Sequence, residues 1–225
     1  TGRCPQSVRF NGAYGQEIAN VFIELEAIDL NSGETKVFSK DDCKFGYRDS
    51  IFRRELSGMY FITSLRIKLK KSPPKGPFYS AIETYFSKSN IRTNSLTSAQ
   101  ILEAVAKIRS DKLPDPDLIP SAGSFFKNAI ISGNKAQEIK SKYGDNLPLF
   151  DLKNGNYKIS TGWLIDKSGL KGVEISGMKP HDKNALVLTN ISANSFKDLA
   201  SARQEIIKTV ENKFGILIEQ EPLEI

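Results

Sequence analysis

Alternating apolar and polar residues mark the β-strands of this chain. Val21–Leu30 (VFIELEAIDL) alternates along its length, which is typical of a half-buried strand. A turn over residues 31–34 follows, and Tyr60–Leu69 (YFITSLRIKL) predicts a second long strand. Shorter strands are predicted at Lys36–Phe38, Ala185–Thr189 and Ile216–Glu219.

Helices are predicted where apolar residues recur at helical spacing behind a capping residue. Thr97 caps a helix with an apolar face made of Ile101, Leu102, Val105 and Ile108. Ser195 caps the longest helix, which ends at Gly215 and has a buried face made of Leu199, Ile206, Ile207 and Val210. A helix is predicted at Ser132–Tyr143, and a short one after the cap-like Ser39–Asp42, before Phe45. Gly162–Ser168 is a short amphipathic segment.

The prolines of Leu113–Pro120 (LPDPDLIP) predict a stiff linker between two parts of the chain. Because strands and helices follow one another without βαβ regularity, we expect an α+β fold. Residues 1–118 should form the first domain with its linker, 119–215 a smaller α+β domain, and 216–225 a strand that returns to the first domain. The second domain should bury Phe125, Trp163, Leu164, Leu186, Leu188, Ile206 and Val210.

Composition and charge narrow the classes of protein. The 225 residues include no apolar run of the ~18 residues that a membrane span needs. Two cysteines outside any C-x-x-C pair and a single histidine, His181, favour a cytosolic protein with reduced thiols and no structural zinc site. The protein is expected to be a monomer. The net charge of +6 admits a nucleic-acid partner, but the one dense basic run, Arg66–Lys71, alternates with Leu and Ile and favours a strand with a solvated face.

Four short stretches carry more polar and structure-breaking residues than a core requires. Two glycines in Asn11–Gly15 permit close approach of the backbone to a ligand, although a plain turn explains them equally. Arg48, between Tyr47 and Asp49, is either a surface ion-pair residue or a carboxylate clamp. Ser124 has no G-x-S-x-G frame, which argues against a serine hydrolase. The acids of Glu219–Glu221 have no distinguishing pattern of their own.

Taken in order, these stretches resemble the UDP-N-acetylenolpyruvoylglucosamine reductase family. The resemblance runs from NGAYGQE at residue 11 to IEQE at residue 218, and so covers nearly the whole chain. The blocks between them are CKFGYRDS, KLPDP, GSFFKN, GWLID and GLKG, which begin at residues 43, 112, 123, 162 and 169. Six or more blocks in the right order make the resemblance specific, whereas one glycine loop would not.

The resemblance implies a flavoenzyme of peptidoglycan synthesis. It implies that NADPH reduces FAD and that the flavin reduces the enolpyruvyl ether of UDP-N-acetylglucosamine to UDP-N-acetylmuramate. Arg48 then matches an arginine that stabilises the negatively charged intermediate, Glu221 a glutamate that acts with it, and Ser124 the proton donor. Arg48 and Glu221 are therefore expected to share one cavity.

The resemblance also implies binding positions. Substrate-binding positions are Tyr85, Lys112, Asn128 and Asn184, with Tyr85 on a loop that closes over the uridine diphosphate. Flavin-binding positions are Gly12, Ala13, Tyr14, Gly15 and Arg109. The first domain is then the remnant of a flavin-binding α+β domain, and the second is the substrate-binding domain.

The family has roughly another hundred residues before this stretch, including a glycine- and serine-rich loop that holds the flavin pyrophosphate. The chain is therefore expected to be an N-terminally truncated member. Two alternatives stay open: a fragment that binds the UDP-sugar without flavin or redox activity, and a nucleic-acid-binding protein suggested only by the charge of +6.

Overall fold

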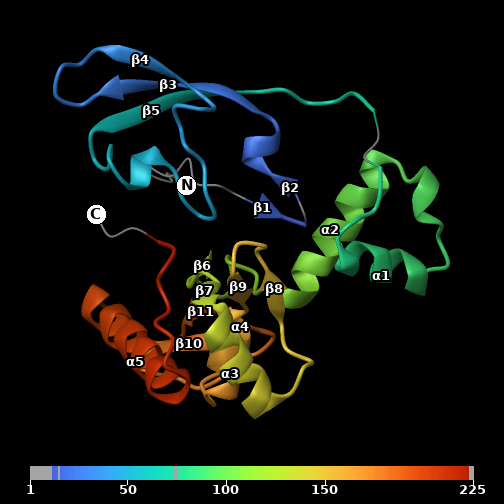
Figure 1. Cartoon of the computed structure of the whole chain (residues 1–225), viewed down its shortest axis with the longest axis vertical. Helices are drawn as coiled ribbons and strands as arrows, with labels where there is room; N and C mark the ends of the chain where they lie inside the picture. Colours follow the sequence, from blue (N-terminus) through green and yellow to red (C-terminus); the bar gives the residue numbers. More distant parts are fainter. Residues whose placement is uncertain (1–11, 15, 73–74, 223–225) are drawn as a thin grey trace. The chain divides into compact units, whose positions relative to one another are not determined.

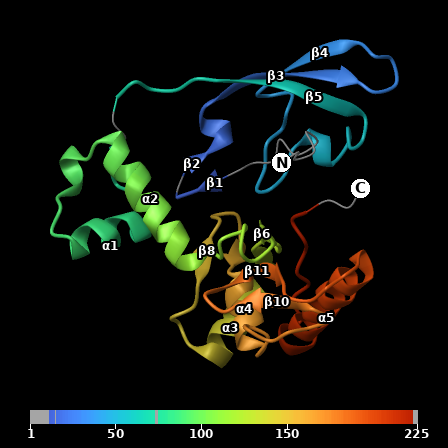
Figure 2. The same cartoon turned by 180° about the vertical axis from the view of Figure 1, so that it is seen from behind.

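The computed structural model describes residues 12–14, 16–72 and 75–222 of the chain. It divides into two compact units at the Ile108–Arg109 bond, and each unit contains both strands and helices (Figures 1 and 2). The α+β expectation is confirmed by this content of strands and helices. The division falls inside a helix, about ten residues before the predicted boundary at 118.

The first unit is built on a three-stranded antiparallel sheet. Strand β3 (Phe22–Asp29) is central, with β4 (Thr35–Ser39) on one side and β5 (Tyr60–Ile67) on the other. All three strands were predicted within a few residues. The core on one face of the sheet consists of Phe22, Leu25, Ala27, Phe38, Cys43, Phe52 and Ile62. Burial raises the pKa of the Cys43 thiol to about 12, so this thiol is an inert core group.

The helix predicted after Ser39–Asp42 is wrong. Ser39 and Asp42 do exchange the two hydrogen bonds of a capping box: the Asp42 amide donates to Ser39 Oγ at 3.3 Å, and the Ser39 amide donates to Asp42 Oδ2 at 2.9 Å. The segment nevertheless forms only a turn, because the chain must reach the buried Cys43 directly afterwards. A capping box stabilises a turn, and a helix forms only where the following residues continue the helical backbone.

Two helices make a second core in the first unit. Helix α2 (Ser98–Lys112) follows Thr97, whose Oγ1 accepts a hydrogen bond from the Gln100 amide, as the predicted cap requires. Helix α1 (Ser80–Lys88), which the sequence analysis missed, packs Ile82 and Phe86 into the same cluster. Leu102 is 71% exposed, contrary to prediction, and Ala104 is buried instead. The buried stripe therefore runs through residues 101, 104, 105 and 108, and Leu102 lies about 100° around the helix from it.

The second unit has two small antiparallel sheets and three helices. The sheet β10–β11–β6 joins Met178–His181, Asn184–Asn190 and Ser121–Ser124. The sheet β7–β9–β8 joins Ala129–Ser132, Asn156–Ile159 and Leu149–Asp151. The helices are α3 (Gly133–Tyr143), α4 (Thr161–Lys167) and α5 (Phe196–Phe214), of which α3 and α5 lie close to their predicted positions.

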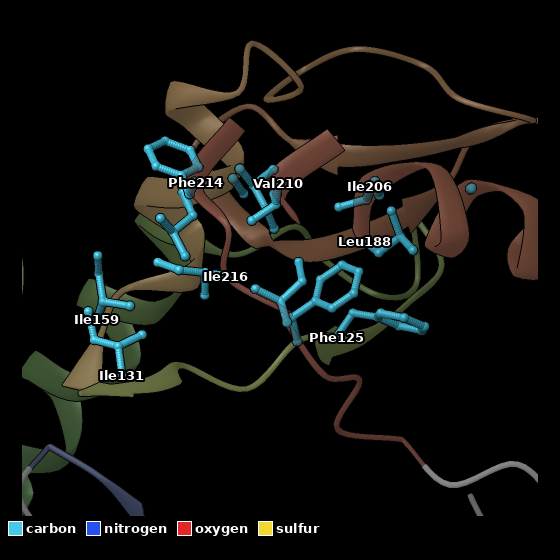
Figure 3. Close-up of a cluster of buried hydrophobic side chains, with 14 of the residues drawn as sticks. Phe125, Ile131, Ile159, Leu188, Ile206, Val210, Phe214 and Ile216 are labelled. Atoms are coloured by element: carbon cyan, nitrogen blue, oxygen red, sulfur yellow. The ribbon is translucent and has the colours of Figure 1, made fainter. Parts of the chain in front are cut away.

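One apolar cluster joins these elements (Figure 3). Five of the seven predicted core residues are buried: Phe125, Leu164, Leu188, Ile206 and Val210. Trp163 and Leu186 are half-buried and pack against the same cluster. The Trp163 ring lies edge-to-face on Tyr143, with the two ring centroids 5.4 Å apart.

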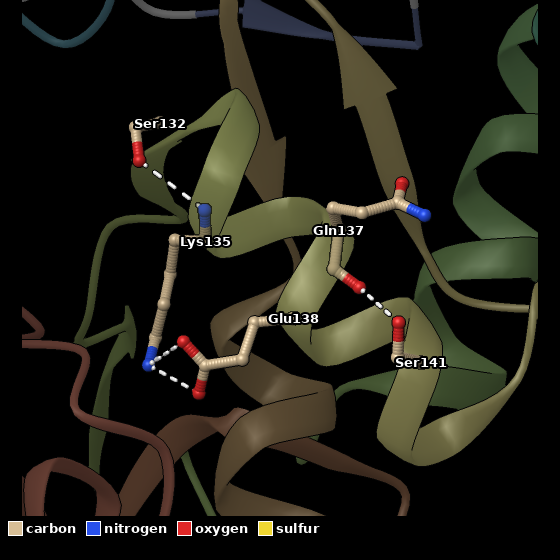
Figure 4. A network of polar contacts seen from close by, with 5 residues as sticks. All are labelled: Ser132, Lys135, Gln137, Glu138 and Ser141. Atoms are coloured by element: carbon tan, nitrogen blue, oxygen red, sulfur yellow. Dashed lines mark hydrogen bonds and ion pairs between the residues drawn. The ribbon is translucent and has the colours of Figure 1, made fainter.

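Helices α5 and α3 are fixed at their first turns by side-chain caps. Ser195 and Asp198 form a complete capping box at the start of α5, and Gly215 ends this helix in the left-handed conformation at φ 61°. The cap at Ser195 and the end of the helix at Gly215 were both predicted. At α3, Ser132 Oγ accepts from the Lys135 amide at 3.3 Å, and the Lys135 ammonium pairs with Glu138 at 2.9 Å (Figure 4). Helix ends that are satisfied in this way give the second unit rigid supports.

Two connecting segments differ in how well they were predicted. Leu113–Pro120 contains no helix, as its prolines predict. The strand predicted at Ile216–Glu219 is absent. Among the described residues this segment makes one isolated bridge, between Phe126 and Gln220. Burial alternates along it, with Ile216 and Ile218 buried in the core of the second unit and Leu217 exposed. That residues 216–225 return to the first domain stays a prediction. Within the described residues, no helix has the length and apolar content that crossing a bilayer requires.

We expect Ile206→Ala to lower the free energy of unfolding by about 2–5 kcal/mol, because Ile206 is fully buried and the change leaves a cavity in the core. Leu217→Ala, at a position 63% exposed, is the matched control and should cost far less. Urea denaturation of both variants measures the difference. Equal losses would contradict this assignment of the core.

We expect part of the stability of α5 to depend on pH through Asp198. Hydrogen bonds from the Asn194 amide and from Ser195 hold the pKa of Asp198 below its ordinary value. A lowered pKa adds stability above the unfolded-state pKa, and this stability is lost as the pH falls through the folded-state pKa. The melting temperature of Asp198→Asn should therefore lie below that of the unmodified chain at about pH 7, and the two should converge towards about pH 2.

Lys208→Gln, an exposed change on the same helix, serves as the control for Asp198→Asn. Its melting temperature should differ from that of the unmodified chain by an amount that does not vary across this acid range. A difference for Asp198→Asn that persists unchanged at the acid end would show that the carboxylate is not the source.

Candidate functional site

Ser124 lies at the end of β6, where the strand passes into the buried pair Phe125 and Phe126. It is paired with Val187 of β11, and the next amide, that of Phe125, donates to the Leu186 carbonyl at 2.7 Å. The Ser124 residue is exposed, whereas Phe125 and Phe126 are 5% and 2% exposed. The two phenylalanines thus anchor the chain and leave the hydroxyl-bearing residue at the surface.

Glu221, near the C-terminal end of the second unit, bonds the segment that follows Ser124. Its amide donates to the Phe125 carbonyl at 2.7 Å, and the Lys127 amide donates to the Glu219 carbonyl at 2.9 Å. Ser124 and Glu221 are 97 positions apart in the sequence, yet both border the same residue, Phe125. Of the three predicted catalytic residues, these two are connected through the backbone of Phe125, which follows Ser124 and bonds Glu221.

Asn128 and its two neighbours are held by Thr161, a buried residue that the sequence analysis missed. Thr161, 0% exposed at the start of α4, donates from Oγ1 to the Lys127 carbonyl at 2.6 Å and accepts from the Ala129 amide at 3.1 Å. The Thr161 amide donates to Asn128 Oδ1 at 3.1 Å. The Asn128 amide group is thereby fixed in orientation. The available signal was the Ser160–Thr161 pair ahead of the short amphipathic segment Gly162–Ser168, because Ser and Thr are common at helix starts.

Two further side chains fix the segment that carries Glu221, and neither was predicted. Lys127, with a side chain 16% exposed, pairs with Glu219 through Nζ and Oε2 at 2.7 Å. Arg203, on α5, donates from Nη1 to Gln220 Oε1 at 2.7 Å. A single sequence gives no signal for either contact, because each joins residues at least 17 positions apart.

Asn184 begins β11, three residues before the partner of Ser124. Its Oδ1 accepts from the Leu186 amide at 3.2 Å, which stabilises the turn that returns from β10. His181 is paired with Asn184 across this turn, and burial lowers the pKa of the His181 imidazole. Asn184 therefore lies on the same sheet as Ser124, with its amide oxygen occupied by the local turn.

Lys112 and Arg109 lie in the last turn of α2, and both residues are exposed. Cations at this position complement the negative end of the helix dipole, which is a structural reason for their presence. Their exposed ammonium and guanidinium groups are also suited to a phosphate or pyrophosphate group.

Arg48 occupies a strained turn in the first unit. The Gly46 and Asp49 backbone groups bond each other at 3.0 and 3.1 Å, and Arg48 has a φ of 54°, which is uncommon outside glycine. Its guanidinium lies 5.2 Å from the centroid of the Tyr47 ring. The neighbouring carboxylate, Asp49, pairs with Arg54 at 3.0 Å, and Arg54 also donates to the Lys44 carbonyl at 3.1 Å.

Arg54 was missed by the sequence analysis and supports the turn from outside it. Backbone strain at a charged residue is typical of functional sites, and Arg48 is such a residue. Arg48 belongs to the first unit and Glu221 to the second, so that the two share one cavity stays a prediction.

Tyr85 lies on helix α1, where a loop was expected. It is half-buried and meets Phe86 edge-to-face at 5.3 Å between ring centroids. The nine residues of α1 bury Ile82 and Phe86, and this i, i+4 spacing explains why a helix forms here.

The predicted flavin positions in the first unit form a small hairpin. β1 (Gly12–Ala13) pairs with β2 (Gln16–Glu17), and Tyr14 in the turn has a φ of 53°. Tyr14 contacts Tyr79 edge-to-face at 5.7 Å and packs against the α1–α2 core. Gly15 lies outside the described residues. In the part of the chain that the structure describes, no group of three His, Cys, Asp or Glu side chains is arranged to hold a metal ion.

Comparisons with known proteins agree with this arrangement. Residues 114–225 match the model of the UDP-N-acetylenolpyruvoylglucosamine reductase C-terminal domain. The UDP-N-acetylenolpyruvoylglucosamine reductase of Photobacterium profundum is 36% identical over 211 residues, or 93% of this chain and 59% of that protein. The reductase of the same name from Amoebophilus asiaticus is 39% identical over 210 residues, or 93% of this chain and 61% of that protein.

A solved structure shares the fold. The crystal structure of UDP-N-acetylenolpyruvylglucosamine reductase (MurB) from Thermus caldophilus matches with a TM-score of 0.55 and 21% identity, over 94% of this chain and 56% of that one. The chain belongs to the UDP-N-acetylenolpyruvoylglucosamine reductase family, and its second half belongs to the C-terminal domain of that family. It spans about six-tenths of the length of the curated relatives.

We expect Thr161→Val to destabilise the second unit and to loosen Asn128. The change keeps the shape of the side chain but leaves the Lys127 carbonyl and the Ala129 amide without their partner, at a cost of about 1–3 kcal/mol. Thr209→Val is the matched control, because Thr209 Oγ1 donates only to the Glu205 carbonyl within α5. Chemical denaturation compares the two, and a loss no greater at Thr161 than at Thr209 would contradict the role of the buried hydroxyl.

Proposed function

We propose that this chain is the greater part of a UDP-N-acetylenolpyruvoylglucosamine reductase that makes UDP-N-acetylmuramate in the bacterial cytoplasm. The observation that carries the proposal is the meeting of Ser124 and Glu221 at Phe125, within the domain that the family model matches. When bound, FAD supplies the hydride, which comes from NADPH. The residues of the chain supply the remaining chemistry. They must bind an anionic substrate, stabilise one developing negative charge and donate one proton.

Addition of hydride to C3 of the enolpyruvyl ether leaves negative charge on C2 and on the substrate carboxylate. Arg48 is the residue proposed to stabilise this charge, since a guanidinium binds a carboxylate through two parallel hydrogen bonds. Its fixed turn, supported by the Arg54–Asp49 pair, holds the group in place before the charge develops. Preorganised charges stabilise a transition state without the cost of reorienting solvent.

Ser124 is the proposed proton donor to C2, and Glu221 is proposed to act with Arg48 in the same cavity. A serine hydroxyl is a weak acid, but a carbanion-like carbon is a strong enough base to take its proton when the two are well placed. The backbone ladder from β11 through Phe125 to Glu221 supports this role, because it fixes the position of the serine. Position matters more here than acidity.

Substrate binding is proposed for Tyr85, Lys112, Asn128 and Asn184. Lys112 is an exposed cation suited to the diphosphate. Asn128 keeps its amide NH₂ for a ligand, since its Oδ1 accepts from the Thr161 amide. The half-buried ring of Tyr85 offers a surface for stacking or a hydroxyl for a phosphate.

The types of residue at the proposed flavin positions are suited to binding a flavin. Tyr14, which has a φ of 53°, lies in the turn between β1 and β2, and Arg109 provides an exposed cation for a pyrophosphate. Gly12, Ala13, Tyr14, Gly15 and Arg109 are the residues proposed to contact FAD. The reductase is proposed to act as a monomer.

A second candidate is a module that binds the UDP-sugar without redox activity. It is favoured by the span of the chain, which matches 59% of the Photobacterium profundum relative. The absorbance of the purified protein after addition of FAD separates the two. A bound flavin band near 450 nm with NADPH-dependent bleaching supports the reductase, and substrate binding without a bound flavin supports the module.

We expect Ser124→Ala to slow reduction of the substrate by about 10²–10⁴-fold while leaving reduction of the flavin by NADPH nearly unchanged. Only the first of these half-reactions requires a proton at C2. Stability should change little, because Ser124 is exposed and ends a strand. Rapid-reaction kinetics on the complete flavin-loaded protein measures each half-reaction separately.

Ser121→Ala, at the other end of β6, is the matched control and should leave both half-reactions unchanged. If Ser124→Ala slows both half-reactions equally, or slows neither, Ser124 is not the proton donor.

A further inference from the structure

The segment that carries Glu221 has little backbone pairing of its own. We call Ile216–Pro222 the C-terminal strap. Its pairing to the rest of the second unit is the isolated Phe126–Gln220 bridge, with two backbone hydrogen bonds, Lys127 to Glu219 and Glu221 to Phe125. The register of such a segment is specified by its side chains as well as by its backbone bonds.

Apolar side chains specify only part of that register. Ile216 and Ile218 are 4% and 1% exposed, while Leu217 between them is 63% exposed. A slip of one residue would expose both isoleucines and bury Leu217 and the charged Glu219, which is costly. A slip of two residues keeps the alternation, so the isoleucines alone exclude it less strongly.

The Lys127–Glu219 ion pair opposes such a slip in the direction that would bring Leu217 opposite Lys127, and Arg203 opposes it in both directions. Its Nη1 donates to Gln220 Oε1 at 2.7 Å, and Gln220 Nε2 donates to the Pro222 carbonyl at 3.0 Å. A slip of two residues would place Ile218 or Pro222 where Gln220 now lies, and neither side chain can accept a hydrogen bond from a guanidinium. A charged donor left without this acceptor in a partly buried place destabilises the slipped arrangement.

The support behind Arg203 is rigid. Arg203 follows Ala202, which is fully buried, and precedes by one turn Ile206, which is also fully buried. Helix α5 is closed by the Ser195–Asp198 capping box at one end and by Gly215 at the other. Because α5 is packed rigidly, the hydrogen bond from Arg203 fixes the strap relative to this helix.

The Arg203–Gln220 hydrogen bond also determines on which side of the strap the neighbouring side chains lie. Successive side chains of an extended chain point to opposite faces, so Gln220 turned towards α5 favours Glu219 and Glu221 on the other side. Glu219 follows this rule, since it pairs with Lys127 at 2.7 Å. By the same rule the Glu221 side chain belongs to the same side of the strap as Glu219. The Glu221 amide bonds Phe125, the residue that follows Ser124.

We propose that Arg203 is a positioning residue which, through Gln220, fixes the register of the C-terminal strap and hence the place of Glu221 opposite Phe125, the residue that follows Ser124. The proposal rests on the function proposed above for Glu221. Arg203 touches no reacting atom in this scheme. Its effect passes through the amide side chain of Gln220 and the one peptide bond that joins Gln220 to Glu221.

The kinetic test uses the complete, flavin-loaded protein and compares Arg203→Met, Arg203→Lys and Gln220→Leu. Loss of the register should lower the rate of substrate reduction by about 10²-fold, as expected for a displaced catalytic group, with flavin reduction by NADPH unchanged. Arg203→Lys should recover part of the rate, because a single ammonium donor can still reach the amide. Lys208→Met, an exposed change one turn further along α5, should have no effect.

A double-mutant cycle separates positioning from general destabilisation. In a Glu221→Gln background, Arg203→Met should lower the rate of substrate reduction no further, because the group that it positions is already disabled. An additional full loss in that background, or an equal loss in both half-reactions, would overturn the proposal.

Amide hydrogen exchange tests the register independently of activity. Arg203→Met and Gln220→Leu should increase exchange at the Glu221 and Lys127 amides by at least about tenfold, while the amides of α5 remain protected. Unchanged exchange at these two amides overturns the register role. If exchange rises as expected but the unmodified protein reduces no substrate, the proposed function fails and the register role stands.

Discussion

The peptide groups on either side of Phe125 hold the second unit together at the place where chemistry is proposed. The Phe125 amide donates to Leu186 on β11, and its carbonyl accepts from Glu221, so one residue joins a sheet to the C-terminal segment. The Phe125 ring is buried among residues of the core and meets Phe126 edge-to-face at 5.0 Å. Because backbone and side chain are both fixed, Ser124 before it and Glu221 beside it have little freedom.

Polar side chains that lie far apart in the sequence complete this support. Thr161 fixes the Lys127–Ala129 turn, Lys127 pairs with Glu219, and Arg203 bonds Gln220. The Thr161 and Arg203 contacts are partly buried, which makes them stronger than comparable contacts at the open surface, whereas the Lys127–Glu219 pair is exposed on its glutamate side. The arrangement resembles that of many active sites, where groups that touch no substrate hold the ones that do.

The first unit follows a different principle. Its sheet packs one aromatic-rich face, with Phe38 against Phe52 and Tyr60 at 5.0 Å between centroids in each case. Arg48 is presented not by this core but by a turn that strains its backbone and is supported by Arg54. A turn can be strained in this way only because the strands and the short helix around it are stable.

The sequence by itself determined the elements whose signals are local. Strict alternation specifies β3 and β5, and the Ser195 cap with Gly215 specifies α5, because periodicity and capping act over a few residues. The order of several short blocks determined the family and the candidate residues. Only the tertiary structure decided that Leu102 is exposed, that Tyr85 is helical and that Ile216–Glu219 is no strand. It alone placed Thr161, Lys127 and Arg203 behind the site, since these contacts join distant parts of the chain and depend on packing rather than on neighbouring residues.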